Sequence, residues 1–88
     1  MNPHQRLDKY LWCARIAAQR TACAELAASG MVRINRMPTD KPHARVRVGD
    51  VLTVPLHTRV VVIRVLALAE RRGPPAASRA LYEQLEGG

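Results

Sequence analysis

The apolar positions at the start of the chain repeat with the period of an α-helix. At about 100° per residue, one side of a helix beginning at Arg6 carries the apolar residues Leu7, Tyr10, Leu11 and Ala14. The adjacent side carries Arg6 and Lys9. This pattern predicts an amphipathic helix that begins at Arg6 and ends near residues 16–18.

A second helix is predicted immediately afterwards. Thr21 is a suitable N-cap, because its hydroxyl can accept a hydrogen bond from an unpaired amide of the first turn. Gly30 suits the left-handed backbone conformation that ends many helices. Between them, Cys23, Leu26 and Ala27 form a face of mostly small side chains. The first helix can therefore approach this face closely.

The apolar period changes from that of a helix to that of a strand after the second helix. Val32 and Ile34 alternate with Arg33, and residues 45–48 repeat this alternation of valine and arginine. Such a pattern is typical of a strand with one buried face. We therefore expect one side of each segment to enter the core while the other side presents guanidinium groups to solvent.

Two further strands and a terminal helix are predicted in the second half. Residues 51–54 form a strand stopped by Pro55, and the β-branched run within residues 59–68 favours a longer strand over a helix. Residues 76–85, opened by prolines and closed by Gly87, predict a short helix. Its apolar stripe consists of Ala77, Leu81 and Leu85.

The order of the predicted elements defines the fold class. Two helices, then strands, then a short C-terminal helix indicate an α+β fold with a largely antiparallel sheet. A chain of 88 residues accommodates one compact domain. We place this domain at residues 1–69 and treat residues 70–88 as a C-terminal extension that contains the short helix.

Basic residues outnumber acidic ones, and most of the cations are arginines. Fourteen Lys and Arg against seven Asp and Glu give a net charge of +7, and twelve of the fourteen are Arg. Residues 1–50 hold nine cations and four anions, whereas residues 51–88 hold five and three. The field of such a chain favours polyanions, and guanidinium groups pair with phosphate and stack on bases. The composition therefore favours a nucleic-acid partner that contacts the first 50 residues.

The sequence lacks motifs for catalysis, metal binding and membrane insertion. It contains no glycine-rich phosphate loop, nucleophile elbow or paired carboxylates. Cys13 and Cys23 lie ten residues apart without the spacing of zinc ligands. The apolar stretch over residues 60–68 is too short to span a bilayer, and the first residues do not resemble a secretory signal. We expect a non-enzymatic, cytoplasmic protein without metal, cofactor or membrane partner, whose cysteines are buried and reduced.

Cations from separate predicted elements are expected to converge. They are Arg6 and Lys9 on the first helix, Arg20 at the start of the second, and Arg33 on the strand that follows. Antiparallel packing of the helices, with the strand returning beside them, brings these groups onto one concave surface. The backbone amides near residues 19–21 add a phosphate-binding site at the start of the second helix.

Two alternatives to this interpretation remain open. Two helices joined by a short turn can form a DNA-reading helix-turn-helix. A recognition helix uses Arg, Asn or Gln to reach base edges, however, and residues 22–28 contain none of them. Cations that flank the helix instead fit recognition of RNA backbone and shape. The other alternative is an accessory RNA-binding module of an RNA-modification enzyme whose catalytic subunit is a different chain.

Four ordered segments resemble the S-four (S4) RNA-binding domain, named for small-subunit ribosomal protein four. They are Arg6-Leu7-Asp8-Lys9-Tyr10-Leu11, Arg20-Thr21, residues 29–35 and residues 46–52. Residues 70–74 and 80–83 resemble the tail of a narrower group, the small heat-shock S4 proteins that associate with ribosomes. The resemblance implies the S4-like αL fold, in which two N-terminal helices pack on a small, mainly antiparallel sheet.

The resemblance also implies a function and a set of contact residues. It implies non-catalytic binding of structured ribosomal or transfer RNA, and in the heat-shock group binding to free large ribosomal subunits that carry a stalled nascent chain. By position, the RNA surface comprises Arg6, Lys9, Gln19, Arg20, Thr21, Arg33 and Asn35, with Arg36 and Lys41 as peripheral phosphate contacts. Many relatives have Gly at the position of Arg36, so the sequence leaves the length of the turn after Asn35 open.

Overall fold

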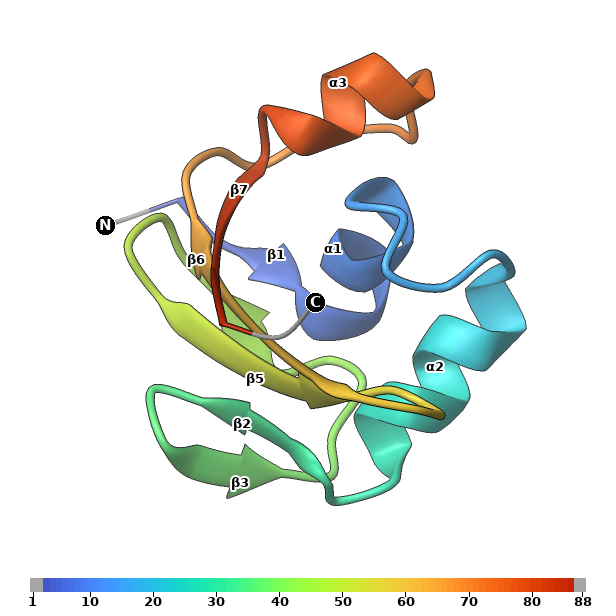
Figure 1. Cartoon of the computed structure of the whole chain (residues 1–88), viewed down its shortest axis with the longest axis vertical. Helices are drawn as coiled ribbons and strands as arrows, with labels where there is room; N and C mark the ends of the chain where they lie inside the picture. The colour runs from blue at the N-terminus through green and yellow to red at the C-terminus, as the bar shows by residue number, and fades with distance from the viewer. Residues whose placement is uncertain (1–2, 87–88) are drawn as a thin grey trace.

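The computed structural model describes residues 3–86, which form three helices and seven strands (Figure 1). The helices are α1 (Leu7–Cys13), α2 (Arg20–Ala28) and α3 (Pro75–Arg79). The strands are β1 (Gln5–Arg6), β2 (Val32–Ile34), β3 (Met37–Thr39), β4 (Arg45–Val46), β5 (Val51–Pro55), β6 (Val60–Val65) and β7 (Tyr82–Glu86). Crossing a bilayer takes about 20 helical residues, and no helix in this part of the chain is long and apolar enough to do so.

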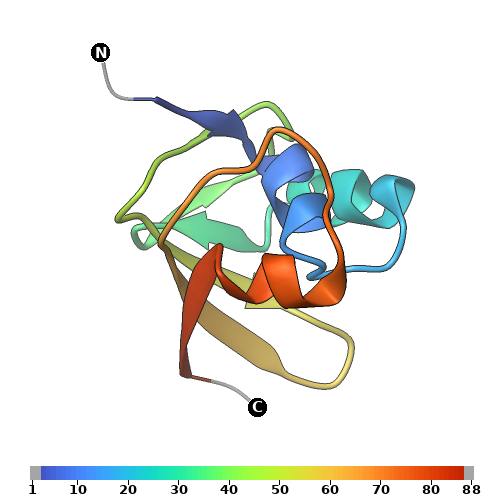
Figure 2. The same cartoon turned by 90° about the horizontal axis from the view of Figure 1, so that it is seen from above.

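A five-stranded antiparallel sheet forms the centre of the fold, with the strand order β3-β2-β5-β6-β7. β1 and β4 form a separate antiparallel pair. α1 and α2 lie side by side against one face of the large sheet, as the view from above shows (Figure 2). The predicted α+β fold, with two N-terminal helices on a mainly antiparallel sheet, is confirmed.

The space between these helices and the sheet is filled by one apolar core. α1 and its C-cap Ala14 contribute the stripe that the helical period predicts. All four residues of this stripe are buried: Leu7, Tyr10, Leu11 and Ala14. β2, β5 and β6 contribute alternate residues, namely Val32, Leu52, Val54, Val61, Ile63 and Val65. The residues between them, such as Thr53 and Arg64, point to the outer face of the sheet. The apolar face of α1 and the inner faces of the strands thus form a single core.

Tyr10 is a fully buried aromatic residue whose hydroxyl group has a hydrogen-bond partner. The hydroxyl donates to the carbonyl oxygen of Leu81 at 2.7 Å, and burial raises the pKa of the phenol above its usual value. The same carbonyl oxygen also accepts the backbone amides of Leu66 and Ala67. Tyr10 therefore ties α1 to the turn between α3 and β7.

Replacing Tyr10 with Phe should lower the free energy of unfolding by about 0.5–1.5 kcal/mol, the usual net contribution of one hydrogen bond. The loss is modest because the carbonyl of Leu81 keeps its two backbone donors, at 2.8 and 3.2 Å. Urea denaturation of both proteins, followed by circular dichroism, measures the difference. A loss above about 3 kcal/mol would mean that the hydroxyl supports more than this one bond.

α1 ends earlier than its apolar period predicts. Arg15 takes the left-handed conformation, with φ of 57°. The amide of Ile16 donates to the carbonyl of Leu11 at 2.9 Å, and the amide of Arg15 donates to that of Trp12 at 3.1 Å. These two bonds form the Schellman pattern of a helix C-terminus. The expected end near residues 16–18 is therefore wrong, because an arginine occupies the position at which glycine usually marks such a stop.

β2 and β3 form a tight hairpin, of which only the first strand is predicted by alternation. Ile34 pairs with Met37, so the turn consists of Asn35 and Arg36 alone. Both turn residues have positive φ, at 51° and 73°, as a type I′ turn requires. The turn left open by the sequence is thus two residues long. β3 contains Pro38 and lies at the edge of the sheet, where a missing amide donor is tolerated.

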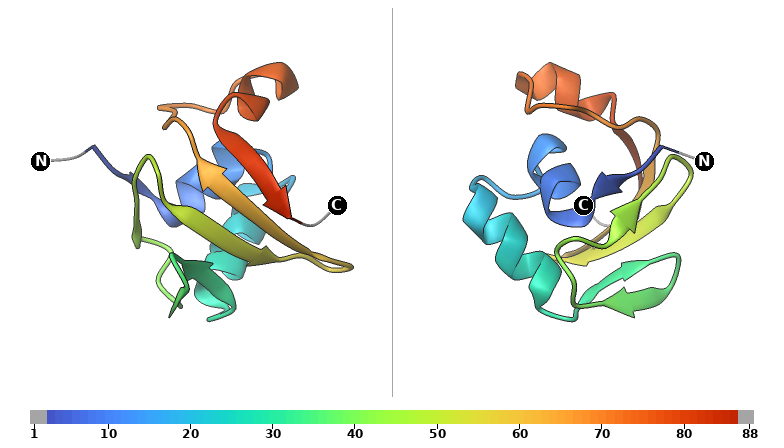
Figure 3. Two further views of the ribbon diagram at one scale, coloured as in Figure 1. Left: turned by 60° about the vertical axis from the view of Figure 1, so that its left-hand side comes forward. Right: turned by 180° about the vertical axis from the view of Figure 1, so that it is seen from behind.

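The C-terminal segment is partly helical and partly extended. α3 ends at Arg79, and β7 pairs antiparallel with β6 (Figure 3). The helix predicted over residues 76–85 is therefore wrong beyond residue 79, while Gly87, its expected end, lies outside the described residues. Pairing with β6 satisfies backbone groups that an unpaired edge would leave open. It also places Leu81 in the core.

Candidate nucleic-acid interface

One group of basic residues belongs to segments that meet where α1 begins. β1 pairs with β4, so that Arg6 lies directly opposite Arg45. The loop before β4 is held against the first turn of α1 by two backbone hydrogen bonds of 2.8 and 3.0 Å, donated by the amides of Leu7 and Asp8. We call the cations of this region the α1 cluster. Its members are Arg6, Lys9, Lys41 and Arg45.

Asp8 orients the guanidinium group of Arg6 within the α1 cluster. The carboxylate of Asp8 accepts hydrogen bonds from Nε and Nη2 of Arg6 at 3.1 and 3.0 Å. The Asp8 side chain is only 9% exposed, whereas that of Arg6 is 59% exposed. An ion pair in which one side chain is exposed to solvent contributes little to stability. The pair therefore serves to position the Arg6 guanidinium, one edge of which is held while the rest faces solvent.

Arg45 is a member of the α1 cluster that the sequence did not single out. Side chains directly opposite each other on antiparallel strands have Cβ atoms about 4.5–5.5 Å apart, and like charges there repel. Arg6 and Arg45 are both exposed, so an anion bound between them would relieve this repulsion. Only the pairing of residues 5–6 with residues 45–46 reveals Arg45, because the two segments are distant in the sequence.

A second group of predicted contact residues lies at the start of α2. Gln19, Arg20 and Thr21, which we call the α2 cluster, are all exposed. The N-cap of α2 is Gln19, and no side chain caps the helix. The prediction of Thr21 as N-cap is therefore wrong, since Thr21 lies inside the first turn. The uncapped amides of this turn can donate hydrogen bonds to a phosphate.

Trp12 fixes the position of Arg20 in the α2 cluster. The guanidinium carbon of Arg20 lies 5.3 Å from the centre of the Trp12 ring, within the range of a cation–π interaction. Trp12 belongs to α1, and α1 packs against α2. The view from behind shows the two helices together with β1 and β4 (Figure 3, right). The α1 cluster and the α2 cluster therefore belong to adjoining elements on the helical side of the fold.

Arg33 lies on the opposite face of the sheet. It is directly across from Thr53 in the pairing of β2 with β5, and both side chains project from the outer face. The expectation that Arg33 joins the helix cations on one concave surface is therefore wrong. The alternation of the sequence already indicates this orientation. Val32 and Ile34 enter the core beneath the helices, so Arg33 must point the other way.

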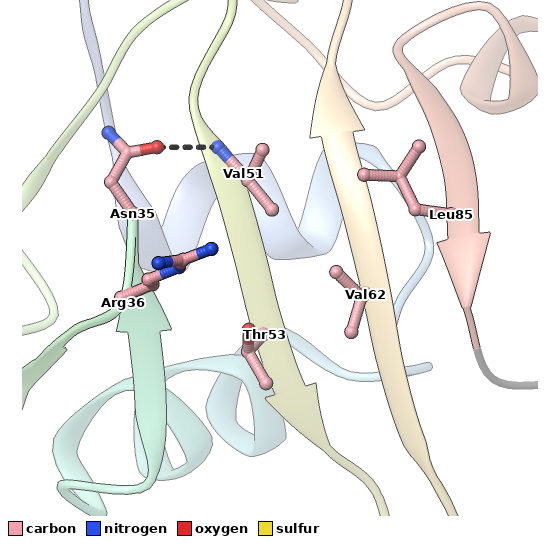
Figure 4. Close-up of a pocket in the computed structure, with 6 residues that line it drawn as sticks. All are labelled: Asn35, Arg36, Val51, Thr53, Val62 and Leu85. Atoms are coloured by element: carbon pink, nitrogen blue, oxygen red, sulfur yellow. Dashed lines mark hydrogen bonds between the residues drawn. The ribbon is translucent and has the colours of Figure 1, made fainter.

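Asn35 has a structural role in the β2–β3 turn. Its Oδ1 accepts the amide of Val51 at 2.9 Å (Figure 4), and its Nδ2 donates to the carboxylate of Asp50 at 3.0 Å. These bonds hold the turn against β5. Arg36 lies beside it, at a hollow of about 470 Å³ on the outer face of the sheet. The other residues that line this hollow are Val51, Thr53, Val62 and Leu85.

Replacing Arg36 with Gly should raise the free energy of unfolding by up to about 1 kcal/mol. At φ of 73°, a side chain strains the backbone, and glycine removes this strain at some entropic cost in the unfolded chain. The matched control is Arg36→Ala, which removes the same charge but keeps the Cβ atom. Urea denaturation compares the variants, and an equal gain in both would show that strain is not the cause.

Neither cysteine is positioned for chemistry. Cys13 and Cys23 are buried free thiols, which confirms their predicted burial. Burial also raises the pKa of the Cys23 thiol, which disfavours the reactive thiolate form. Among the residues that the structure describes, no group of three His, Cys, Asp or Glu side chains could hold a metal ion.

Comparison with known proteins relates this chain to one domain family. The sequence model of the S4 domain matches residues 5–52. The RQC P-site tRNA stabilizing factor of Listeria monocytogenes is 35% identical over 65 residues, which cover 74% of this chain and 70% of that protein. Heat shock protein 15 of Escherichia coli is 33% identical over 79 residues, which cover 90% of this chain and 59% of that protein.

A solved structure shows the same fold. The trimeric structure of Vibrio cholerae heat shock protein 15 matches with a TM-score of 0.86 at 25% sequence identity. The match covers 94% of this chain and 83% of that chain. The segment matched by the S4 domain contains every member of the α1 cluster and of the α2 cluster, whereas α3 and β7 lie beyond it.

Proposed function

We propose that this chain, which belongs to the S4 domain family, binds structured RNA through the side of the fold that carries α1 and α2. The observation that supports this most directly is the position of the α1 cluster and the α2 cluster on adjoining elements of that side. Guanidinium and ammonium groups pair with phosphate, and the uncapped amides of α2 add to such a site. The affinity should therefore be largely electrostatic.

We further propose that the RNA is ribosomal or transfer RNA and that the large ribosomal subunit is the partner, in the rescue of stalled ribosomes or in the heat-shock response. The names of the relatives support this role, since one is a P-site tRNA stabilizing factor and another a heat shock protein. In this proposal the protein acts in the cytoplasm by binding alone, without catalysis or a cofactor.

The exposed surface of α2 favours RNA over duplex DNA. After Thr21, the exposed side chains of α2 are Glu25 and Ala28. A recognition helix in the major groove needs several side chains that reach base edges, and this surface offers one carboxylate and no Arg, Asn or Gln. Cations at the start of a helix fit contacts with the RNA backbone instead.

Titration with two ligands tests the proposal. Fragments of large-subunit ribosomal RNA and DNA duplexes of equal length are compared at the same salt concentration. We expect tighter binding to the RNA, with an affinity that falls steeply as salt rises. Tighter binding to the duplex would contradict the proposal and favour the DNA-binding alternative. A pull-down that returns an RNA-modifying enzyme would favour the accessory-module alternative.

A further inference from the structure

A loop outside the segment matched by the S4 domain also carries arginines beside the α2 cluster. Residues 70–73 follow β6 and lead to α3, passing near the end of α1 (Figure 1). Arg72 donates from Nε to the carbonyl oxygen of Trp12 at 3.2 Å. From the other side, Arg15 donates from Nε and Nη2 to the carbonyl oxygen of Gly73 at 3.3 and 2.9 Å. The loop is therefore fixed against the end of α1.

Arg20 and the loop arginine Arg72 both contact the ring of Trp12. The two guanidinium carbons lie 5.3 and 5.4 Å from the centre of the same indole ring. The electron-rich ring attracts both guanidinium groups. In the described part of the chain, neither arginine forms an ion pair with a carboxylate. The pair is therefore a positive site that the protein itself does not neutralise.

We infer that residues 70–73 extend the RNA-binding surface. In this extension Arg71 and Arg72 contact phosphates beside Arg20. The ring of Trp12 holds the guanidinium groups of Arg20 and Arg72 in place. The inference rests on the proposed function, because it extends the same RNA surface beyond residue 52. Arg71 is exposed next to the anchored Arg72. Planar guanidinium forks match the oxygens of a phosphodiester backbone, so the chemistry of the loop fits RNA.

Two double variants with the same change in net charge test the loop. The loop variant carries Arg71→Gln and Arg72→Gln. The control variant carries Arg59→Gln and Arg64→Gln, which neutralise exposed cations in the turn between β5 and β6 and on the outer face of β6. Affinity for large-subunit ribosomal RNA is measured over a series of salt concentrations, and near-ultraviolet circular dichroism verifies that both variants are folded. The wild-type protein is measured in the same series.

The loop variant should bind RNA about tenfold or more weakly at physiological salt, with a salt dependence reduced by about two phosphate contacts. The control variant should stay within about twofold of the wild type, since salt screens distant charges. Equal losses in both variants would assign the effect to net charge and overturn the inference. An unchanged loop variant would also overturn it, but would leave the proposed function intact. Failure of the wild type to bind RNA would overturn the proposed function itself.

Substitutions of Trp12 test its role as a positioning residue. Trp12→Phe keeps an aromatic ring, whereas Trp12→Leu keeps an apolar side chain without one. We expect Trp12→Phe to retain the salt dependence of the wild type and Trp12→Leu to lose about one phosphate contact. Because Trp12 is the single tryptophan of the chain, its fluorescence in the wild type should change on RNA binding. Equal salt dependence in the two variants would contradict the role of the ring.

Discussion

Replacement of Leu11 with Ala is expected to lower the free energy of unfolding by about 2–5 kcal/mol. Leu11 is fully buried in the core between α1 and the sheet. The substitution loses the transfer free energy of the deleted groups and leaves a cavity that the close-packed neighbours refill only in part. Small domains have a total stability of about 5–15 kcal/mol, so this loss is a large fraction of the total. The melting temperature should therefore fall by roughly 10 °C or more.

The same substitution at an exposed position provides the control. Leu66 follows β6 and is 47% exposed. Leu66→Ala should therefore cost about 1 kcal/mol or less, although the chemical change is identical. Urea denaturation followed by circular dichroism measures both variants. A near-neutral effect of Leu11→Ala would contradict the packing of α1 on the sheet.

Replacement of Arg20 with Ala is expected to weaken binding to large-subunit ribosomal RNA by about fivefold at physiological salt and to reduce its salt dependence by about one phosphate contact. Arg20 is exposed at the start of α2, and its guanidinium lies over the Trp12 ring. The fold should stay intact, because an exposed cation–π contact contributes only about 0.5–1 kcal/mol.

Arg33→Ala removes the same charge from the opposite face of the sheet. Arg33 is exposed across from Thr53, so its loss should change the salt dependence less than the loss of Arg20. Fluorescence anisotropy of a labelled RNA fragment, measured at several salt concentrations, compares the two variants. An unchanged salt dependence in Arg20→Ala would show that Arg20 faces away from the bound RNA.

The core of this fold is predictable from the sequence because local period and burial agree. The stripe of Leu7, Tyr10 and Leu11 has the helical period, and every member is fully buried. Val32 and Ile34 likewise occupy the inner face that their alternation predicts, although Ile34 is only partly buried. These elements follow from the sequence because their apolar residues all turn toward one shared core.

Two strands that lack the alternation of a strand could not be predicted in this way. Residues 76–85 carry a helical stripe, yet β7 forms there because the edge of β6 offers it hydrogen-bond partners. β3 was missed because a three-residue edge strand that contains Pro38 shows no alternation. In both segments tertiary pairing outweighs local pattern.

The candidate site likewise contains residues that local pattern identifies and residues that it does not. Arg20 and Gln19 could be selected because they adjoin the start of a predicted helix, where phosphates bind readily. Arg45 could not be selected, because its place opposite Arg6 depends on the pairing of β1 with β4. Arg72 was out of reach for a similar reason, since its contact with Trp12 joins residues that are 60 positions apart.

RNA binding by the helical side of the fold is tested most directly by two variants with equal loss of charge. The helical-side variant carries Arg6→Gln, Lys9→Gln, Arg20→Gln and Arg45→Gln. The sheet-side variant carries Arg33→Gln, Arg36→Gln and Arg64→Gln on the outer face of the sheet, and Arg59→Gln in the turn between β5 and β6. For each, the affinity for large-subunit ribosomal RNA is measured against salt concentration. We predict that the helical-side variant loses about three to four phosphate contacts from its salt dependence while the sheet-side variant stays close to the wild type. A larger loss in the sheet-side variant would contradict RNA binding by the helical side.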